Sequence, residues 1–89
     1  MDETRLDSEL AGRYDADEGE RRAVVRAARD LADSGRLAAD RGVSLTATGV
    51  VDELGDAPEG SLAERWNWWI GALELAYGGY GEFRVRRHP

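Results

Sequence analysis

Hydrophobic residues recur along much of this chain at the three- and four-residue spacing of an amphipathic helix. Between residues 20 and 33 the apolar positions fall on one side of a helix, and the other side is polar and rich in Arg. Ser34 and Gly35 follow this stretch and favour a break or irregular turn at residues 34–36. The apolar side of this predicted helix comprises Val24, Ala27, Ala28 and Leu31.

In a second apolar stretch, residues 43–54, the spacing of the hydrophobic residues changes from every second position to helical spacing. Val43, Leu45 and Ala47 alternate with polar residues, which predicts a short strand. The pattern then returns to helical spacing, from about residue 46 or 48 to Leu54. Gly55 is a suitable helix end, and residues 56–60 contain both a Pro and a Gly, as turns do.

A third helix is predicted to begin at Ser61. Residues 61–64 read S-L-A-E, a capping box in which the Ser and Glu side chains accept from each other's backbone N–H. Trp68 is the one Trp of this helix that projects away from its apolar side. The apolar side comprises Leu62, Trp66, Trp69, Ile70 and Leu73.

The sequence allows two interpretations of where this third helix ends. It could continue through Tyr77, with Trp68, Ala72 and Leu75 forming a second apolar stripe. Alternatively it ends near Gly71, and residues 73–77 and 83–85 form the two arms of a β-hairpin around a glycine-rich turn. We favour the hairpin, because residues 83–85 otherwise have no strand partner.

The first eighteen residues are acidic and polar. Leu6, Leu10 and Tyr14 stand four residues apart, which would suit one edge of a short helix. Because the surrounding residues are so polar, we expect residues 1–18 to be a flexible acidic arm and residues 19–89 to be a single domain. The alternative is that the arm is a first helix packed on the body.

Charge and composition narrow the class of protein. The chain has 89 residues, no Cys, twelve basic residues that are all Arg, and eighteen acids, giving a net charge of −6. This composition resembles that of proteins from halophilic archaea, although a GC-rich genome could also produce it. Because no apolar run is long enough to span a bilayer, we expect no membrane association and a cytoplasmic location.

Residues 45–86 resemble the working half of a winged helix-turn-helix. The order of helix, short strand, helix, turn, helix and hairpin is that of the family, and Leu54, Leu62, Trp66 and Trp69 match its buried positions. The resemblance implies a mostly α-helical α+β fold, a winged-helix-like three-helix domain with a small β-hairpin. It also implies a non-catalytic DNA-binding module of the transcription-regulator type, here working in high salt.

The same resemblance implies which residues would touch DNA. A recognition helix reads base edges with its outward residues. Among these, Asn67 suits adenine, whereas Glu64 would be repelled by phosphate. Arg65 lies near the edge of the buried side of this helix. In this family the wing contacts the phosphate backbone, and Arg84, Arg86 and Arg87 would lie on the wing or just after it. The nucleic-acid-binding residues implied are therefore Asn67, Arg65, Arg84, Arg86 and Arg87.

Trp68 supports a different function. An outward Trp is typical of an interface hot spot, so the alternative is a protein–protein interaction or homodimerisation module that binds no nucleic acid. Trp68 and Leu75 are the interface residues of this reading. A further row of Arg22, Arg26 and Arg29 could hold phosphates, but such a row is more often a solvated face paired with acids.

Catalysis is not expected. His88 is the one histidine, so neither a His-based catalytic pair nor a His-ligated metal site can be assembled, and there is no thiol. The chain has no nucleophile motif and no phosphate-binding glycine loop. We expect no enzyme activity, no cofactor, no metal and no small-molecule substrate.

Overall fold

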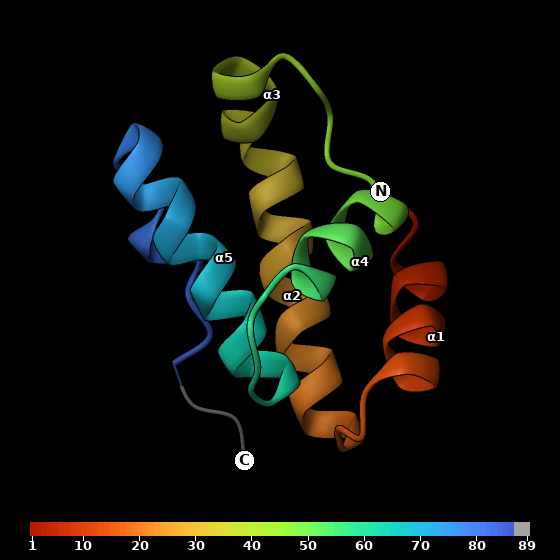
Figure 1. Cartoon of the computed structure of the whole chain (residues 1–89). Coiled ribbons are helices and arrows are strands. Elements are labelled where there is room, and N and C mark those ends of the chain that lie inside the picture. Colours follow the sequence, from red (N-terminus) through yellow and green to blue (C-terminus); the bar gives the residue numbers. More distant parts are fainter. Residues whose placement is uncertain (87–89) are drawn as a thin grey trace.

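The computed structural model describes residues 1–86, in which five α-helices and one short 3-10 helix surround a single core (Figure 1). The long helix α2 is central: α1 lies on one side of it and α5 on the other, while α4 contacts both α1 and α5. None of the helices described is long and apolar enough to cross a membrane. The helices are α1 (Glu3–Arg13), α2 (Glu18–Ser34), α3 (Arg36–Arg41), α4 (Ala47–Gly55), α5 (Leu62–Tyr77) and η1 (Gly81–Phe83).

Most of the apolar positions predicted from helical spacing form the core; Ala27 is only partly buried, and Tyr80, expected in a turn, is fully buried. Each fully buried aliphatic side chain contributes about 1.5–3 kcal/mol, so the pattern of burial outweighs weak local preferences. The residues with no exposed surface include Leu6, Leu10, Val24, Ala28, Leu31, Val50, Leu54, Trp66, Ile70 and Tyr80.

Two of the predicted helix boundaries are confirmed, and local chemistry explains both. The capping box at Ser61 is confirmed: the Ser61 hydroxyl accepts from the N–H of Glu64 at 3.3 Å, and Glu64 accepts from the N–H of Ser61 at 2.9 Å. The break expected at residues 34–36 is also present. It lies at Gly35, whose φ of 69° is a left-handed conformation that glycine adopts without strain.

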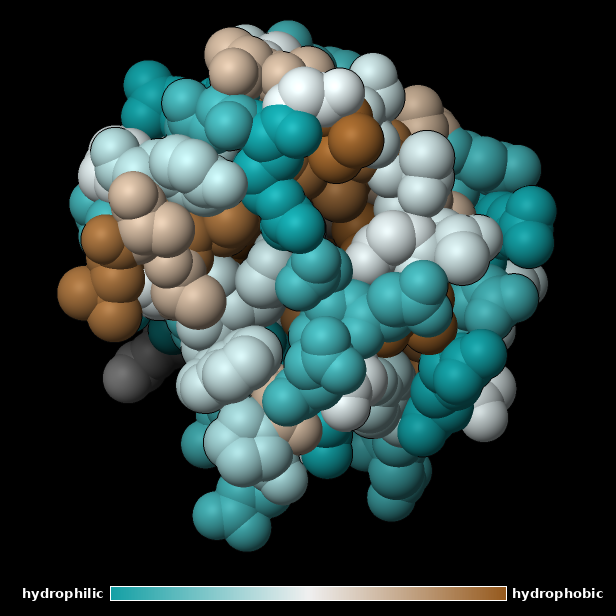
Figure 2. Space-filling model, turned by 45° about the horizontal axis from the view of Figure 1, so that its top comes forward, coloured by the Kyte–Doolittle hydropathy of each residue, from teal (hydrophilic) through white to brown (hydrophobic). Residues whose placement is uncertain are grey.

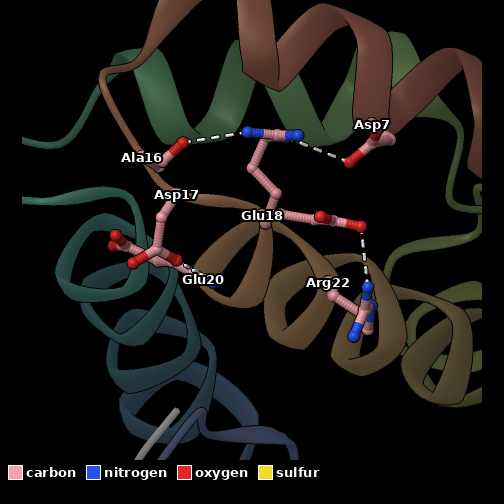
Figure 3. Close-up of polar contacts among 7 residues, drawn as sticks. Asp7, Ala16, Asp17, Glu18, Glu20 and Arg22 are labelled. Carbon is pink, nitrogen blue, oxygen red and sulfur yellow. Dashed lines mark hydrogen bonds and ion pairs between the residues drawn. The ribbon is translucent and has the colours of Figure 1, made fainter. Parts of the chain in front are cut away.

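The residues expected to form a flexible arm instead include a helix that packs on the body. Leu6 and Leu10 of α1 are fully buried, and Asp2 caps the helix by accepting from the N–H of Arg5. Arg21 of α2 donates to the Asp7 carboxylate and the Ala16 carbonyl, which ties α1 and the following loop to α2 (Figure 3). The acids lie on the outer side and at caps, so they do not prevent the two leucines from being buried.

The predicted β-hairpin is wrong, and with it the α+β, winged-helix-like fold class, because the described residues 1–86 contain no strand. Helix α5 continues to Tyr77. The apolar residues that alternate between positions 73 and 77 lie on different sides of this helix: Leu73 is buried, whereas Leu75 and Tyr77 are exposed. Residues 83–85 pack against α5 through side-chain hydrogen bonds, which replace the strand partner that they lack. The short strand expected at residues 43–47 is also absent; a loop there leads to Thr46, which caps α4.

Candidate interaction site

The turn of α5 at residues 66–69 reads W-N-W-W, and two of its three Trp side chains belong to the core. Trp66 is fully buried, and its indole Nε1 donates to the carbonyl oxygen of Phe83 at 2.8 Å. Trp69 meets Trp66 edge to face, with ring centroids 5.3 Å apart. These contacts give both rings a structural role.

Asn67 also faces the protein. Its Nδ2 donates to the carbonyl oxygen of Val85 at 2.7 Å, and its Oδ1 accepts from the N–H of Val85 at 2.8 Å. The two groups that would read an adenine are therefore engaged in holding the C-terminal segment. Nothing in the local sequence signals this contact, because the two residues are eighteen positions apart.

Arg65 is likewise occupied within the domain. Its guanidinium donates to the carbonyl oxygens of Leu54, Ala57 and Gly60, and it lies 5.4 Å from the ring centre of Tyr14. Arg65 thus joins the end of α4, the following turn and the end of α1. A phosphate would have to compete with three backbone carbonyls for this side chain.

Trp68 is the exception in the W-N-W-W turn, since 44% of its surface is exposed. It begins a row of exposed apolar residues on one side of α5, which we call the α5 stripe: Trp68, Ala72, Leu75 and Ala76. Leu75 is 92% exposed and Tyr77 is 47% exposed. Figure 2 shows brown, apolar atoms projecting at the left edge of a mostly teal and white surface, on the side where α5 lies in Figure 1.

A groove of about 300 Å³ runs beside the α5 stripe. Its apolar wall consists of Trp68, Trp69, Ala72, Leu73, Ala76 and Tyr77. Its charged rim comes from the other side, where Arg41 and Glu53 form an ion pair at 3.2 Å beside Asp56. Sequence spacing identifies Trp68 and Leu75, but the rim is formed by residues far away in the chain.

The predicted wing arginines lie in a different part of the molecule. Arg84 and Arg86 are exposed on the segment that follows η1, and Arg87 lies outside the described residues. The structure brings Arg84 and Arg86 to a second groove, which Arg22 and Arg26 of α2 also line. The sequence shows both pairs of arginines but contains no signal that they meet.

A fully buried tyrosine, Tyr80, lies at the junction of α3 and the C-terminal segment. The Tyr80 hydroxyl donates to the Asp40 carboxylate at 2.7 Å. Burial, supported by this hydrogen bond, raises the pKa of Tyr80 to about 12. Arg36 lies against the same ring, 5.8 Å from its centre, and donates to the carbonyl oxygen of Gly79. This cluster fastens the chain after α5 and is structural in character.

Glu74 closes the end of α5. Its carboxylate accepts from the backbone N–H groups of Gly79, Tyr80 and Gly81 at 2.8–3.1 Å. The N–H groups of Gly79 and Gly81, which are the largest causes, lower the pKa of Glu74. A carboxylate at a helix C-terminus opposes the helix dipole, so these three hydrogen bonds explain its presence there.

Metal-binding chemistry has no candidate group in the part of the chain that the structure describes. No cluster of three or more His, Cys, Asp or Glu side chains is placed to hold an ion there. Within the same residues, every buried side-chain nitrogen and oxygen has a hydrogen-bond partner. The candidate site is therefore a surface formed by the α5 stripe and its groove.

Comparison with known proteins agrees with the prominence of this turn. A family model described as the WNWW domain matches residues 1–74, which include α1 to α4 and most of α5. The four letters of that description are the residues at positions 66–69 of this chain. No curated protein and no solved structure matches the chain.

Proposed function

The chain belongs to the WNWW domain family, and we propose that it is a non-catalytic protein-interaction domain that docks through the α5 stripe. The observation that supports this function is that three residues of the W-N-W-W turn make internal contacts while the fourth is exposed. Trp66, Asn67 and Trp69 make internal contacts, whereas Trp68 presents its ring to solvent. Exposed Trp side chains flanked by further apolar groups are typical of interface hot spots.

The partner that the stripe fits best is a second copy of this chain. Large and small side chains alternate along it, in the order Trp68, Ala72, Leu75 and Ala76. If two α5 helices pair antiparallel with Ala72 on the twofold axis, Trp68 of each copy lies opposite Ala76 of the other. Such an interface is self-complementary, as twofold symmetry requires.

The groove beside the stripe would receive the Trp68 ring of the second copy. Its wall is apolar where the ring would insert, and its rim carries both Arg41 and the acids Glu53 and Asp56. A net charge of −6 opposes association of two copies at low salt, and added salt screens that repulsion. We therefore expect the association to strengthen as salt is raised.

Protein interaction ranks above the expected DNA binding in our proposal. Asn67 and Arg65, two of the implied nucleic-acid contacts, make their hydrogen bonds within the domain. The cytoplasmic location and the salt-rich setting stay predictions from composition.

Sedimentation velocity of the full chain in molar KCl tests the proposal. We expect wild type to sediment as a dimer, and both Trp68→Ala and Ala72→Arg to sediment as monomers. Val43→Ala is the matched control, because Val43 is an exposed large hydrophobic residue outside the stripe and should leave the dimer intact. A wild-type monomer at every concentration, or a Trp68→Ala dimer, would overturn the proposal.

A further inference from the structure

A second groove, of about 500 Å³, lies between α2 and residues 82–86, which comprise the end of η1 and the segment after it. It shares no lining residue with the groove beside the α5 stripe. Four exposed cations surround it: Arg22 and Arg26 from α2, and Arg84 and Arg86 from the C-terminal segment. We call it the arginine groove. Its apolar lining is formed by Ala23, Ala27, Phe83 and Val85.

The charge of the arginine groove runs against that of the whole protein. The chain has a net charge of −6, yet only two acids, Asp30 and Glu82, line this groove beside the four arginines. Within residues 1–86, Arg26, Arg84 and Arg86 form no ion pair. Arg22 pairs with Glu18 at 2.7 Å, but both side chains are about three-quarters exposed, so this pair is weak (Figure 3).

We propose that the arginine groove binds an acidic segment of a partner protein, with carboxylates on the arginines and aliphatic or aromatic side chains on the apolar lining. Charge complementarity selects an anion, and the guanidinium fork suits carboxylates in two-point contact. The apolar lining selects a ligand that alternates acidic and apolar groups. This inference does not depend on the α5 stripe.

A peptide fits this groove better than a nucleic acid does. A duplex presents phosphates on its outside and has few apolar groups for Phe83 and Val85 to contact. The acids Asp30 and Glu82 on the lining would also repel a continuous row of phosphates. A peptide can place its apolar side chains between the cations and leave these two acids facing solvent.

The construction of the groove explains why its two sides stay together. Phe83 and Val85 are buried, and their backbones are held by Trp66 and Asn67 of α5. Ala23 and Ala27 on α2 are small, which leaves the space that a larger side chain would fill. The groove is thus preformed, which reduces the entropic cost of binding.

Fluorescence anisotropy on the full chain tests the inference, using a short fluorescein-labelled peptide in which Asp and Leu alternate. We expect binding to weaken by about tenfold or more in Arg26→Ala/Arg86→Ala, as lost charge-assisted hydrogen bonds imply. The matched control is Arg5→Ala/Arg13→Ala, which removes the same charge from exposed positions on α1 and should leave binding within about twofold of wild type.

Three comparisons decide between explanations. A peptide in which Ser replaces Leu should bind more weakly, and equal binding would overturn the role of the apolar lining. The variant Arg26→Glu/Arg86→Glu should gain binding to a peptide that alternates Lys and Leu, a gain that a misfolded variant cannot show. A labelled DNA duplex that binds more tightly than the acidic peptide, with the same dependence on Arg26 and Arg86, would overturn the proposal in favour of nucleic acid.

Discussion

Asn67 on α5 and Val85 near the end of the described chain exchange two hydrogen bonds, one to each backbone group of Val85. A neighbouring β-strand satisfies the backbone of a strand residue in the same way. Here one carboxamide does so, and the fully buried Trp66 takes up the carbonyl of Phe83 nearby. An extended segment is therefore attached to a helix without any sheet.

Replacing Asn67 with Ala should loosen this attachment. The change leaves the partly buried N–H and carbonyl of Val85 without partners, which should cost about 1–3 kcal/mol of unfolding free energy. Denaturant titration measures the loss, and amide exchange at Val85 should accelerate more than exchange within α2. Ser8→Ala, which removes an exposed hydroxyl on α1, should change stability by less than about 0.5 kcal/mol. Unchanged exchange at Val85 would show that other contacts hold the segment.

Glu20 connects α2 to the start of α5. Its side chain is buried, and Oε2 accepts from the N–H of Ala63 at 2.8 Å. Glu20→Ala leaves this N–H unpaired and should reduce stability by about 1–3 kcal/mol. Glu20→Gln keeps an acceptor oxygen but loses the charge that favours a helix N-terminus, so its loss should be smaller. Equal losses in urea unfolding of the two variants would contradict the role of the acceptor.

The buried Tyr80 hydroxyl predicts a decline of stability in alkali. Its pKa is about 12 in the folded protein and 10 for an ordinary Tyr, so folding favours the protonated form. The resulting stabilisation is complete below pH 10 and is lost as the pH rises towards 12. Unfolding free energies measured across this range should fall more steeply for wild type than for Tyr80→Phe. Parallel curves would show that Tyr80 is not the titrating group.

Glu74 predicts a dependence at the acid end. Because its pKa is lowered by backbone N–H groups, its contribution is present above the ordinary value of 4.5 and is lost as the pH falls through the lowered value. Glu74→Gln should therefore be less stable than wild type at neutral pH, and the gap should narrow in acid. Thermal unfolding at a series of pH values measures the gap. Glu59→Gln, in the exposed turn before α5, should show no gap at neutral pH.

Substitution of the adjacent Trp68 and Trp69 should reduce stability by very different amounts. Trp69 is buried against Trp66, so Trp69→Ala should cost about 3–5 kcal/mol. Trp68→Ala removes a half-exposed ring and should cost the isolated chain about 1 kcal/mol or less. Denaturant unfolding at a concentration too low for association makes the comparison. A large loss for Trp68→Ala would assign this ring to the core instead of an interface.

The helices were predictable from the sequence to different degrees. Helix α2, the start of α5 at Ser61 and the break near Gly35 depend on spacing and on neighbouring residues, so local patterns suffice. Helix α1 also has apolar residues at helical spacing, but its acidic composition led us to predict a flexible arm. What decided the outcome was burial of Leu6 and Leu10 against α2 and α4, a tertiary effect.

The C-terminal segment and the arginine groove could not be predicted from sequence patterns, because both depend on contacts between residues far apart in the chain. Residues 83–85 alternate as a strand does, yet their partners are the side chains of Trp66 and Asn67. The helical period identified Trp68 as an outward residue, and it placed Leu75 beside Trp68 only in the alternative in which the helix continues through Tyr77. The sequence could not predict that Arg26 and Arg86 line the same groove, because this depends on how the C-terminal segment packs along α2.

One turn of α5 is attached to both proposed binding surfaces. Trp68 points outward from the turn, while Asn67 and Trp66 hold the segment that carries Phe83 and Val85. A partner that displaced this turn would also shift one wall of the arginine groove, so binding at one surface would be coupled to binding at the other. Such coupling is reciprocal: each ligand must change the affinity of the other by the same factor.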